Sequence, residues 1–308
     1  MTRTASLQFG GPTRSHVLRA TYLGVLGHHR AEYRVKDLCR VAEVPRSTYY
    51  AWLRHQPSRR DLADEALLED IRAIHERSRA TYGAPRIWGQ LRHQGHRIGR
   101  HRVARLMAKD GLVGVHGRKK WRRGRRDVAP APDLLQRDFS ASRPDERWVA
   151  DVSEFHCLDG KLFLAGIRDL YDHTLVGWSM GERQGTDLVV SALVMALSRR
   201  RPEGDLLHHS DKGSIYTSLE FANRLSDWSV TPSFGSTGDC FDNAAMESFW
   251  GHAKREIEYF HGPVKDLTRS QLRTIIFDYV EVFYNRERHQ ATLGHRTPAE
   301  VYAAAKVA

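Results

Sequence analysis

Three carboxylic acids occupy positions that are unusual for a charged side chain. Asp151 lies in the middle of a predicted strand over residues 148–156, and burying an unpaired carboxylate there costs several kcal/mol. Asp211 directly follows a short apolar run, and Glu247 lies on a predicted helix. At about 100° per residue, Glu247 falls on the face of that helix opposite its apolar side chains. It is therefore available to a site at the edge of a sheet.

Carboxylates supplied by neighbouring strands and a facing helix can bind divalent cations. Their hard oxygen atoms suit Mg²⁺ or Mn²⁺, and two such ions can lie about 4 Å apart. The pair of ions activates an attacking oxygen and stabilises the leaving oxygen of a phosphodiester, so no covalent nucleophile is required. Any one of these acids alone is better explained as a helix cap or a salt-bridge partner. The three together favour two-metal phosphodiester chemistry.

The elements that must position these acids are predicted from the spacing of apolar residues. Alternating and continuous apolar runs predict strands over 148–156, 162–170, 174–180 and 205–209. Helical spacing predicts helices over 185–200, 219–228, 242–260 and 267–286, and from 298 onward. This order is that of the ribonuclease-H-like α/β fold. We therefore expect residues 143–308 to form a ribonuclease-H-like core with C-terminal helices.

Residues 31–113 are predicted to be all-α and to contain two helix-turn-helix-like units. Such a unit can place the start of its second helix in a DNA major groove. The expected DNA contacts are Arg46, Ser47, Thr48 and Tyr49 in the first unit, and Arg100, His101 and Arg105 in the second. In the first unit, a plain two-helix hairpin with an aromatic core explains the pattern equally well. In the second, the crowding of basic residues favours DNA contact over plain solvation.

Residues 114–142 lose apolar periodicity and form a predicted basic linker. Seven of the nine residues 118–126 are positively charged, and the expected DNA contacts there are Arg118, Lys119, Lys120, Trp121, Arg122 and Arg123. Such an arm would add salt-sensitive, sequence-independent affinity through counterion release, and Trp121 could stack on a base. The alternative is a tether that does not touch DNA. Residues 1–30 show no sustained periodicity and are expected to be a flexible lead-in.

Composition excludes several classes of protein. Residues 1–142 carry 29 basic and 13 acidic side chains, a net charge of +16, whereas residues 143–308 carry −5 of the total +11. A basic front half is typical of a module that binds a polyanion such as nucleic acid. No stretch approaches the roughly 18 apolar residues of a membrane span. The three cysteines form no Cys-x-x-Cys pair, so neither a disulfide framework nor a cysteine zinc site is indicated, and a cytosolic location fits.

The chain resembles the catalytic subunit, encoded by the second reading frame, of the insertion-sequence-three family of bacterial transposases. That family belongs to the acidic-triad (DDE) transposase and retroviral-type integrase superfamily. The resemblance covers about residues 34 to 303 and is carried by segments 44–50, 83–112, 209–216, 242–243, 247–250, 254–256, 284–290, 293–294 and 297–298. Thirty-five residues separate Asp211 from Glu247. The departures are small: Lys212 stands where the family commonly has Arg, and residues 172–174 replace a commoner Ser-Arg pair.

The resemblance implies a role for each acid. Asp151, Asp211 and Glu247 would be the catalytic acids that bind two Mg²⁺ or Mn²⁺ ions per active site. Lys254, about 11 Å along the helix from Glu247, would contact the terminal DNA of the element. The enzyme would bind the inverted-repeat ends of an insertion sequence, nick a 3′ end and transfer the strand to target DNA.

The same resemblance implies partners and a location. The protein would act as a homo-oligomer on double-stranded DNA, assisted by the upstream reading-frame product, and would be cytoplasmic and nucleoid-associated in a bacterium. Two alternatives remain. One is a catalytically silent DNA-binding repressor or domesticated remnant, against which the intact triad argues. The other is a ribonuclease-H-type nuclease without end specificity, which the basic front half disfavours.

Overall fold

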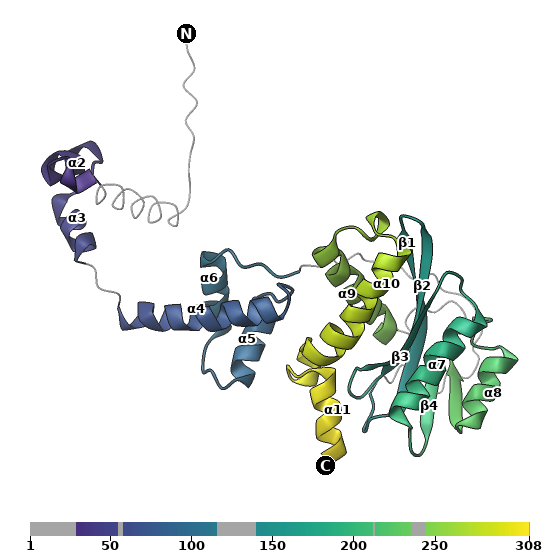
Figure 1. The fold of residues 1–308 in the computed structure, drawn as a ribbon. Helices are drawn as coiled ribbons and strands as arrows, with labels where there is room; N and C mark the ends of the chain where they lie inside the picture. Colours follow the sequence, from purple (N-terminus) through teal and green to yellow (C-terminus); the bar gives the residue numbers. More distant parts are fainter. Residues whose placement is uncertain (1–28, 55–57, 116–139, 212, 236–243, 308) are drawn as a thin grey trace, which may run out of the picture. The chain divides into compact units, whose positions relative to one another are not determined.

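The computed structural model describes residues 29–54, 58–115, 140–211, 213–235 and 244–307. The chain divides into two compact units, Met1–Ala66 and Leu67–Ala308, and Figure 1 traces the elements of both. Within the described ranges, no helix combines the length and the apolar character needed to cross a bilayer.

The first unit is a small helical hairpin. It contains a 3₁₀ turn (His29–Ala31), helix α2 (Val35–Val41) and helix α3 (Arg46–Leu53). The tight turn between the helices includes Glu43, whose φ is 54°. Cys39 of α2 and Tyr49 of α3 are buried and form the core of this unit. Two helices joined by a tight turn match the predicted helix-turn-helix arrangement.

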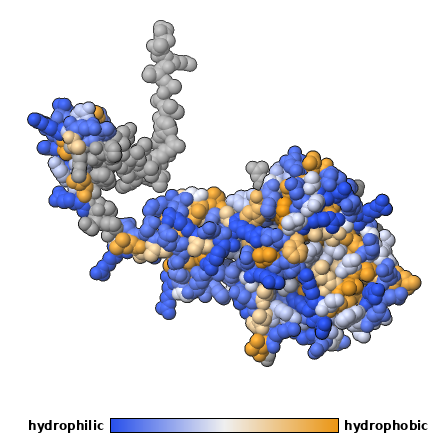
Figure 2. Space-filling model, in the orientation of Figure 1, coloured by the Kyte–Doolittle hydropathy of each residue, from blue (hydrophilic) through white to orange (hydrophobic). Residues whose placement is uncertain are grey.

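The second unit opens with further helices. Helix α4 (Arg59–Arg77) crosses the unit boundary, and α5 (Ala84–His93) and α6 (Arg100–Lys109) follow it. Leu91 of α5 and Val103 of α6 are completely buried. Gly95 turns the chain between these helices with φ 94°, a conformation that costs a glycine little. Hydrophilic side chains dominate the face of α4 and its neighbours in Figure 2.

A five-stranded mixed sheet forms the centre of the second unit. Its strands are β1 (Arg147–Cys157), β2 (Gly160–Asp169), β3 (Leu175–Gly181), β4 (Leu206–Ser210) and β5 (Val230–Phe234). The spatial order is β3-β2-β1-β4-β5. The pairs β1–β2 and β2–β3 are antiparallel, whereas β1–β4 and β4–β5 are parallel. This is the ribonuclease-H-like arrangement that the order of elements predicted.

Helices cover both faces of the sheet. Helices α7 (Thr186–Arg200) and α8 (Leu219–Asp227) pack on one face, and α9 (Ala244–His261) and α10 (Arg269–Asp278) on the other (Figure 1). Alternate side chains of β1 lie on opposite faces of the sheet: Val149 packs on the face covered by α9, and Ala150 on the face covered by α7. Asp151, two residues after Val149, therefore faces α9.

Two elements differ from the sequence-based expectation. Strand β5 was not predicted, because it is short and contains Pro232, a residue that fits only an edge strand. The single helix expected over 267–286 is divided into α10 and a π-helix (Tyr279–Glu287). A capping box at Thr268 begins α10 after a 3₁₀ turn (Val264–Asp266). Helix α11 (Pro298–Val307) ends the described chain.

A buried ion pair joins α9 to the segment after the π-helix. The Glu256 carboxylate, 2% exposed, accepts hydrogen bonds from Arg288 Nε at 2.9 Å and Arg288 Nη2 at 2.9 Å. The Tyr279 hydroxyl donates to Glu256 Oε2 at 2.8 Å, and Arg86 of α5 lies 3.5 Å from Glu256 Oε1. One buried carboxylate thus connects three segments of the second unit.

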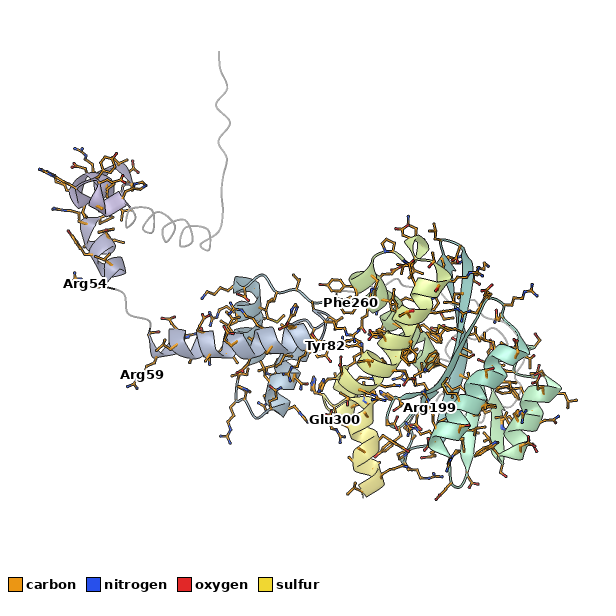
Figure 3. The ribbon with its side chains drawn as sticks, in the orientation of Figure 1. Arg54, Arg59, Tyr82, Arg199, Phe260 and Glu300 are labelled. Atoms are coloured by element: carbon orange, nitrogen blue, oxygen red, sulfur yellow. The ribbon has the colours of Figure 1, made fainter. Side chains whose placement is uncertain are left out.

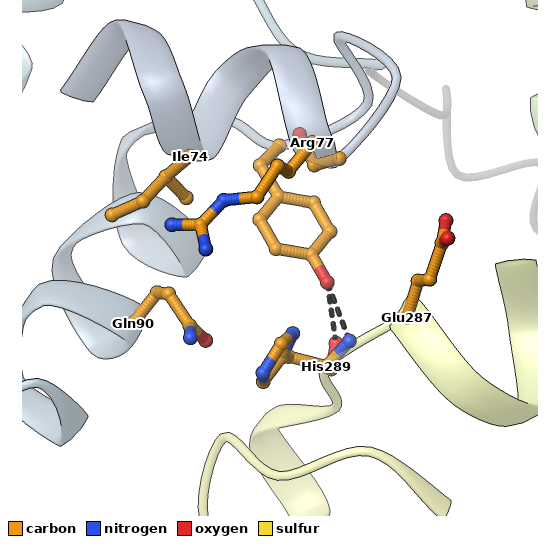
Figure 4. Close-up of a pocket in the computed structure, with 7 residues that line it drawn as sticks. Ile74, Arg77, Gln90, Glu287 and His289 are labelled. Atoms are coloured by element: carbon orange, nitrogen blue, oxygen red, sulfur yellow. Dashed lines mark hydrogen bonds between the residues drawn. The ribbon is translucent and has the colours of Figure 1, made fainter. Parts of the chain in front are cut away.

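Tyr82 makes a second connection between the α4–α5 loop and the C-terminal segment (Figure 3). Its hydroxyl donates to the carbonyl oxygen of His289 and accepts from the backbone N–H of His289. Figure 4 shows this pair at the wall of a cavity of about 260 Å³, which Ile74 and Gln90 also line. Burial raises the pKa of Tyr82 to about 12, so the hydroxyl keeps its proton.

Candidate active site

The parallel pairing of β1 with β4 brings two of the three predicted acids together. Val149 of β1 pairs with His209 of β4, and each strand reaches an aspartate two residues later. Neighbouring strands lie about 4.8 Å apart, and residues two apart in a strand lie on the same face. The register therefore directs Asp151 and Asp211 to adjacent positions at the carboxyl end of β4.

The carboxylate of Asp151 is held by two hydrogen bonds. The Val152 N–H donates to Asp151 Oδ1 at 2.8 Å, and the Trp250 indole Nε1–H of α9 donates to Asp151 Oδ2 at 3.0 Å. Gly166 of β2 pairs with Asp151 of β1, and a Cβ atom at position 166 would lie 3.0 Å from Trp250 Cη2. The absence of a side chain at Gly166 lets the indole lie against the sheet and reach Asp151.

Trp250 donates a hydrogen bond to a predicted catalytic acid, although the sequence analysis assigned it no role. Trp250 belongs to segment 247–250, one of those that carry the family resemblance. The available signal was its position three residues after Glu247, close to one helical turn along the same helix. The interaction with Asp151 could not be derived, because it depends on how closely α9 approaches the sheet.

The electrostatics of Asp151 reflect its surroundings. Burial raises the pKa of Asp151 to about 6, while the hydrogen bonds from Val152 and Trp250 oppose the increase. The negative charges of Asp211 and Glu247 raise the pKa further. The three carboxylates are therefore within electrostatic range of one another, and a cation between them would relieve their repulsion.

Asp211 directly follows the last residue of β4. Its Oδ1 accepts a hydrogen bond from the Gly213 N–H at 3.0 Å. A Cβ at position 213 would lie 3.0 Å from that same oxygen, so glycine leaves room for the carboxylate. The side chain of Asp211 is exposed.

Glu247 lies in the first turn of α9 and is exposed. The neighbouring side chains Met246 and Phe249 are buried and fix the helix on the sheet. The predicted division of the helix into a packed face and a polar face is present, with Ala253 and Ile257 on the packed side. Glu247 is thus on the same helix as Trp250, which donates a hydrogen bond to Asp151.

The chemistry of these donors fits a hard divalent cation. Asp151, Asp211 and Glu247 offer only carboxylate oxygens, which Mg²⁺ and Mn²⁺ prefer. In the part of the chain that the structure describes, no three His, Cys, Asp or Glu side chains are close enough to hold one ion as they stand. Residues 236–243, which lead into α9, lie outside the described residues.

Lys254 is placed differently from a freely exposed DNA contact. It lies on α9 past Glu247, where its Nζ donates to the carbonyl oxygen of Glu154 at 2.8 Å and lies 4.9 Å from the centre of the Phe155 ring. Burial lowers the pKa of Lys254, although the charges of Glu154 and Asp151 counteract this. Lys254 is therefore next to the acidic site and half-buried.

The predicted DNA-contacting residues of the helical units divide into two groups. Arg46, Ser47 and Thr48 are exposed at the start of α3, and Arg100, His101 and Arg105 are exposed on α6. Tyr49 corrects the expectation: it is 1% exposed and packs in the core with Cys39, so its side chain is not available to DNA. Its position on the inner face of a two-turn helix is the reason. The basic arm, Arg118 to Arg123, lies outside the described residues.

Comparison with known proteins agrees with this arrangement. Residues 62–120 match a family described as an HTH-like domain, and residues 141–240 and 229–298 match two families described as an integrase core domain. The chain is 38% identical over 265 residues to the insertion element IS600 uncharacterized 31 kDa protein of Shigella sonnei, covering 85% of this chain and 96% of that protein.

Two further relatives are named as transposases. The transposase for insertion sequence element IS629 of Shigella sonnei is 38% identical over 278 residues, covering 88% of this chain and 92% of that protein. Transposase InsF for insertion sequence IS3A of Escherichia coli strain K12 is 33% identical over 276 residues, covering 88% and 95%. An integrase core behind a helix-turn-helix-like region defines a polynucleotidyl transferase that acts in DNA transposition. The chain belongs to the IS3 family of insertion-sequence transposases, as the sequence resemblance predicted.

Proposed function

We propose that this transposase binds the ends of its insertion sequence, nicks a 3′ end and joins that end to another phosphodiester, with Asp151, Asp211 and Glu247 as its catalytic acids. The observation that carries the proposal is the β1–β4 register, which directs Asp151 and Asp211 to adjacent positions below the helix that bears Glu247. Nicking and joining are the same displacement with water or a DNA 3′-hydroxyl as nucleophile, so one site serves both steps.

The residues of the chain prepare this site. Asp151, Asp211 and Glu247 would hold two Mg²⁺ or Mn²⁺ ions, which when bound supply activation of the attacking oxygen and stabilisation of the leaving oxygen. Trp250 and the Val152 N–H fix the orientation of the Asp151 carboxylate before DNA arrives. Lys254, whose ammonium group feels the charge of Asp151, would neutralise a phosphate next to the reacting one once its bond to Glu154 is exchanged.

The direct experiment is incubation of the protein with labelled element ends, scoring nicked and joined products together. We expect both products with Mg²⁺ or Mn²⁺, and DNA binding with little chemistry in Ca²⁺. Specific binding of the ends without any nicked product in Mg²⁺ or Mn²⁺ would favour the repressor alternative. Nicking of unrelated duplexes at the same rate would favour the simple nuclease.

Replacing Trp250 by Phe should weaken productive Mg²⁺ binding by about 10–100-fold, the usual cost of losing a hydrogen bond to a metal-binding side chain. The ring would still cover Gly166, but the donor to Asp151 Oδ2 would be lost. The Mg²⁺ concentration giving half-maximal nicking measures the effect. Trp228→Phe is the matched control, because Trp228 is 45% exposed at the end of α8. An unchanged Mg²⁺ requirement in Trp250→Phe would show that the hydrogen bond does not position Asp151.

Neutralising the basic arm should flatten the salt dependence of DNA binding. Substituting the charged residues among 118–126 with glutamine should reduce the slope of log K against log salt by about 0.9 for each phosphate that the arm no longer neutralises. Preference for element ends should survive, because we assign it to α3 and α6. Binding titrations at several salt concentrations measure both quantities. An identical slope would mean that the arm is only a tether.

We propose that the active species is a multimer assembled on DNA and assisted by the upstream reading-frame product. Transposition joins events at two element ends, which one active site cannot hold at the same time. Sedimentation without DNA should show a monomer or weak association, and end binding should improve when the upstream product is fused or added. A stable dimer that pairs both ends at full activity by itself would contradict this proposal.

A further inference from the structure

A cavity of about 330 Å³ lies beside the first turns of α9. Ala245 and Ser248, which flank the Glu247 region of the helix, form part of its wall. The remaining wall comes from further residues of α9, the end of β2 and the turn after it, α5, the π-helix and the segment after the π-helix. The cavity is therefore built from parts of the second unit that the fold holds together, next to the proposed catalytic acid.

The lining of this cavity has an excess of positive charge. Three arginines, Arg86, Arg168 and Arg288, line it, and none of its described lining residues is an aspartate or glutamate. Arg86 and Arg288 share the single carboxylate of Glu256. Arg168, 8% exposed, pairs with no carboxylate among the described residues and donates instead to the carbonyl oxygen of Ala245 at 2.9 Å. A buried guanidinium without an anion is costly, so the cavity favours a negatively charged ligand.

Two buried donors on the cavity lining lack acceptors within the described ranges. They are Arg168 Nε and the side-chain nitrogen of Gln290, whose residue is 7% exposed. The oxygen of the Gln290 amide already pairs with His173 Nδ1 at 3.0 Å, which leaves its NH₂ group unused. Burial, with the charge of Arg168 as a second cause, lowers the pKa of His173 to about 4. The histidine is therefore neutral, and the positive charge of the cavity comes from its arginines.

We propose that this cavity binds a phosphate group of DNA, and that it holds the backbone next to the phosphodiester that reacts at Asp151, Asp211 and Glu247. Arginines and amide donors match the oxygens of a phosphate, and the start of an 18-residue helix favours an anion. The inference rests on the proposed function only for the source of the phosphate. The same chemistry would accept free inorganic phosphate.

The first test measures inorganic phosphate binding by the full chain. Thr292 is an exposed residue on the cavity rim, in the 3₁₀ turn Ala291–Leu293, so Thr292→Glu adds a competing carboxylate without disturbing the core. Ser198→Glu adds the same charge on exposed α7, which covers the other face of the sheet. We expect phosphate to stabilise the wild type and Ser198→Glu against heating, and Thr292→Glu to bind it at least about tenfold more weakly.

The second test identifies the source of the phosphate. A neutral methylphosphonate is placed at one linkage at a time around the nicked position of an element end. One linkage should weaken wild-type binding by about tenfold and cause no further loss in Thr292→Glu, because both changes remove the same interaction. Independent losses at every linkage would overturn the DNA assignment.

The results of these two tests are independent of whether the proposed function is correct. Equal phosphate binding by all three proteins, or none by the wild type, would overturn the anion site whether or not DNA is nicked. Phosphate binding that Thr292→Glu weakens would support the site even if no nicking were found. In that case the proposed transposition chemistry, and not the cavity, would be at fault.

Discussion

Replacing any one of Asp151, Asp211 and Glu247 by its amide should abolish nicking and joining of element ends while leaving DNA binding nearly intact. Each change removes one negative charge and almost no volume, so the fold should persist. We expect a loss of at least about 10³-fold, because even one donor removed from a preorganised active site costs about 10²–10³-fold. Initial nicking rates and end-binding affinities, measured on the same preparations, test this expectation.

The matched control for the triad is Asp227→Asn, because Asp227 is an exposed carboxylate at the end of α8. Its nicking rate should equal that of the wild type. A variant of Asp151, Asp211 or Glu247 that cleaves at the wild-type rate would remove that residue from the catalytic assignment. Loss of DNA binding together with cleavage would indicate a folding defect, which thermal unfolding would reveal.

The second large effect is expected on stability. Glu256→Gln should destabilise the second unit by about 3–5 kcal/mol, the cost of breaking a buried ion pair and leaving its partner unpaired. Arg288 is 4% exposed and would lose its only charged acceptor among the described residues. For a unit of this size, the melting temperature should fall by about 10 °C. Glu258→Gln, two residues along α9 from Glu256 and exposed, should change stability by less than about 0.5 kcal/mol.

This stabilisation should also depend on pH in a defined direction. Burial alone would raise the pKa of Glu256, but the charge and hydrogen bonds of Arg288, with the bond from Tyr279, lower it below its ordinary value of 4.5. The pair therefore stabilises the protein fully above pH 4.5 and loses this contribution as the pH falls through the lowered pKa. The difference between wild type and Glu256→Gln should shrink in that acidic range. A constant difference at all pH values would contradict the ionic explanation.

The proposed function and the cavity beside α9 together describe how DNA could be held during the reaction. The carboxylates would bind the metal ions, and the arginine-lined cavity, whose wall includes Ala245 and Ser248 of α9, would bind a neighbouring phosphate. Because Arg86 of α5 reaches Glu256 and this cavity, the helical region also contributes to the surroundings of the site. A change in α5 could then alter catalysis without touching a catalytic acid.

The local pattern of the sequence was sufficient for most of the secondary structure. Apolar alternation located β1 to β4, and helical spacing located α7 to α9, because these periods follow directly from which side must be buried. Edge strand β5 escaped this reasoning, since Pro232 and a short apolar run carry little signal. The division of the region 267–286 also escaped it, because the change from i→i+4 to i→i+5 hydrogen bonding covers only nine residues, too few for a change of apolar period to be recognised.

By itself, the sequence determined the three acidic positions, the α/β order that could unite them and, through its motifs, the family. Only the tertiary structure decided which side chains meet: Trp250 with Asp151, Arg86 and Arg288 with Glu256, and Tyr49 with the core of its own unit. These contacts join residues that are far apart in the chain, or they depend on which face of a short helix is buried. They depend on strand register and on how closely helices pack, which local periodicity does not encode.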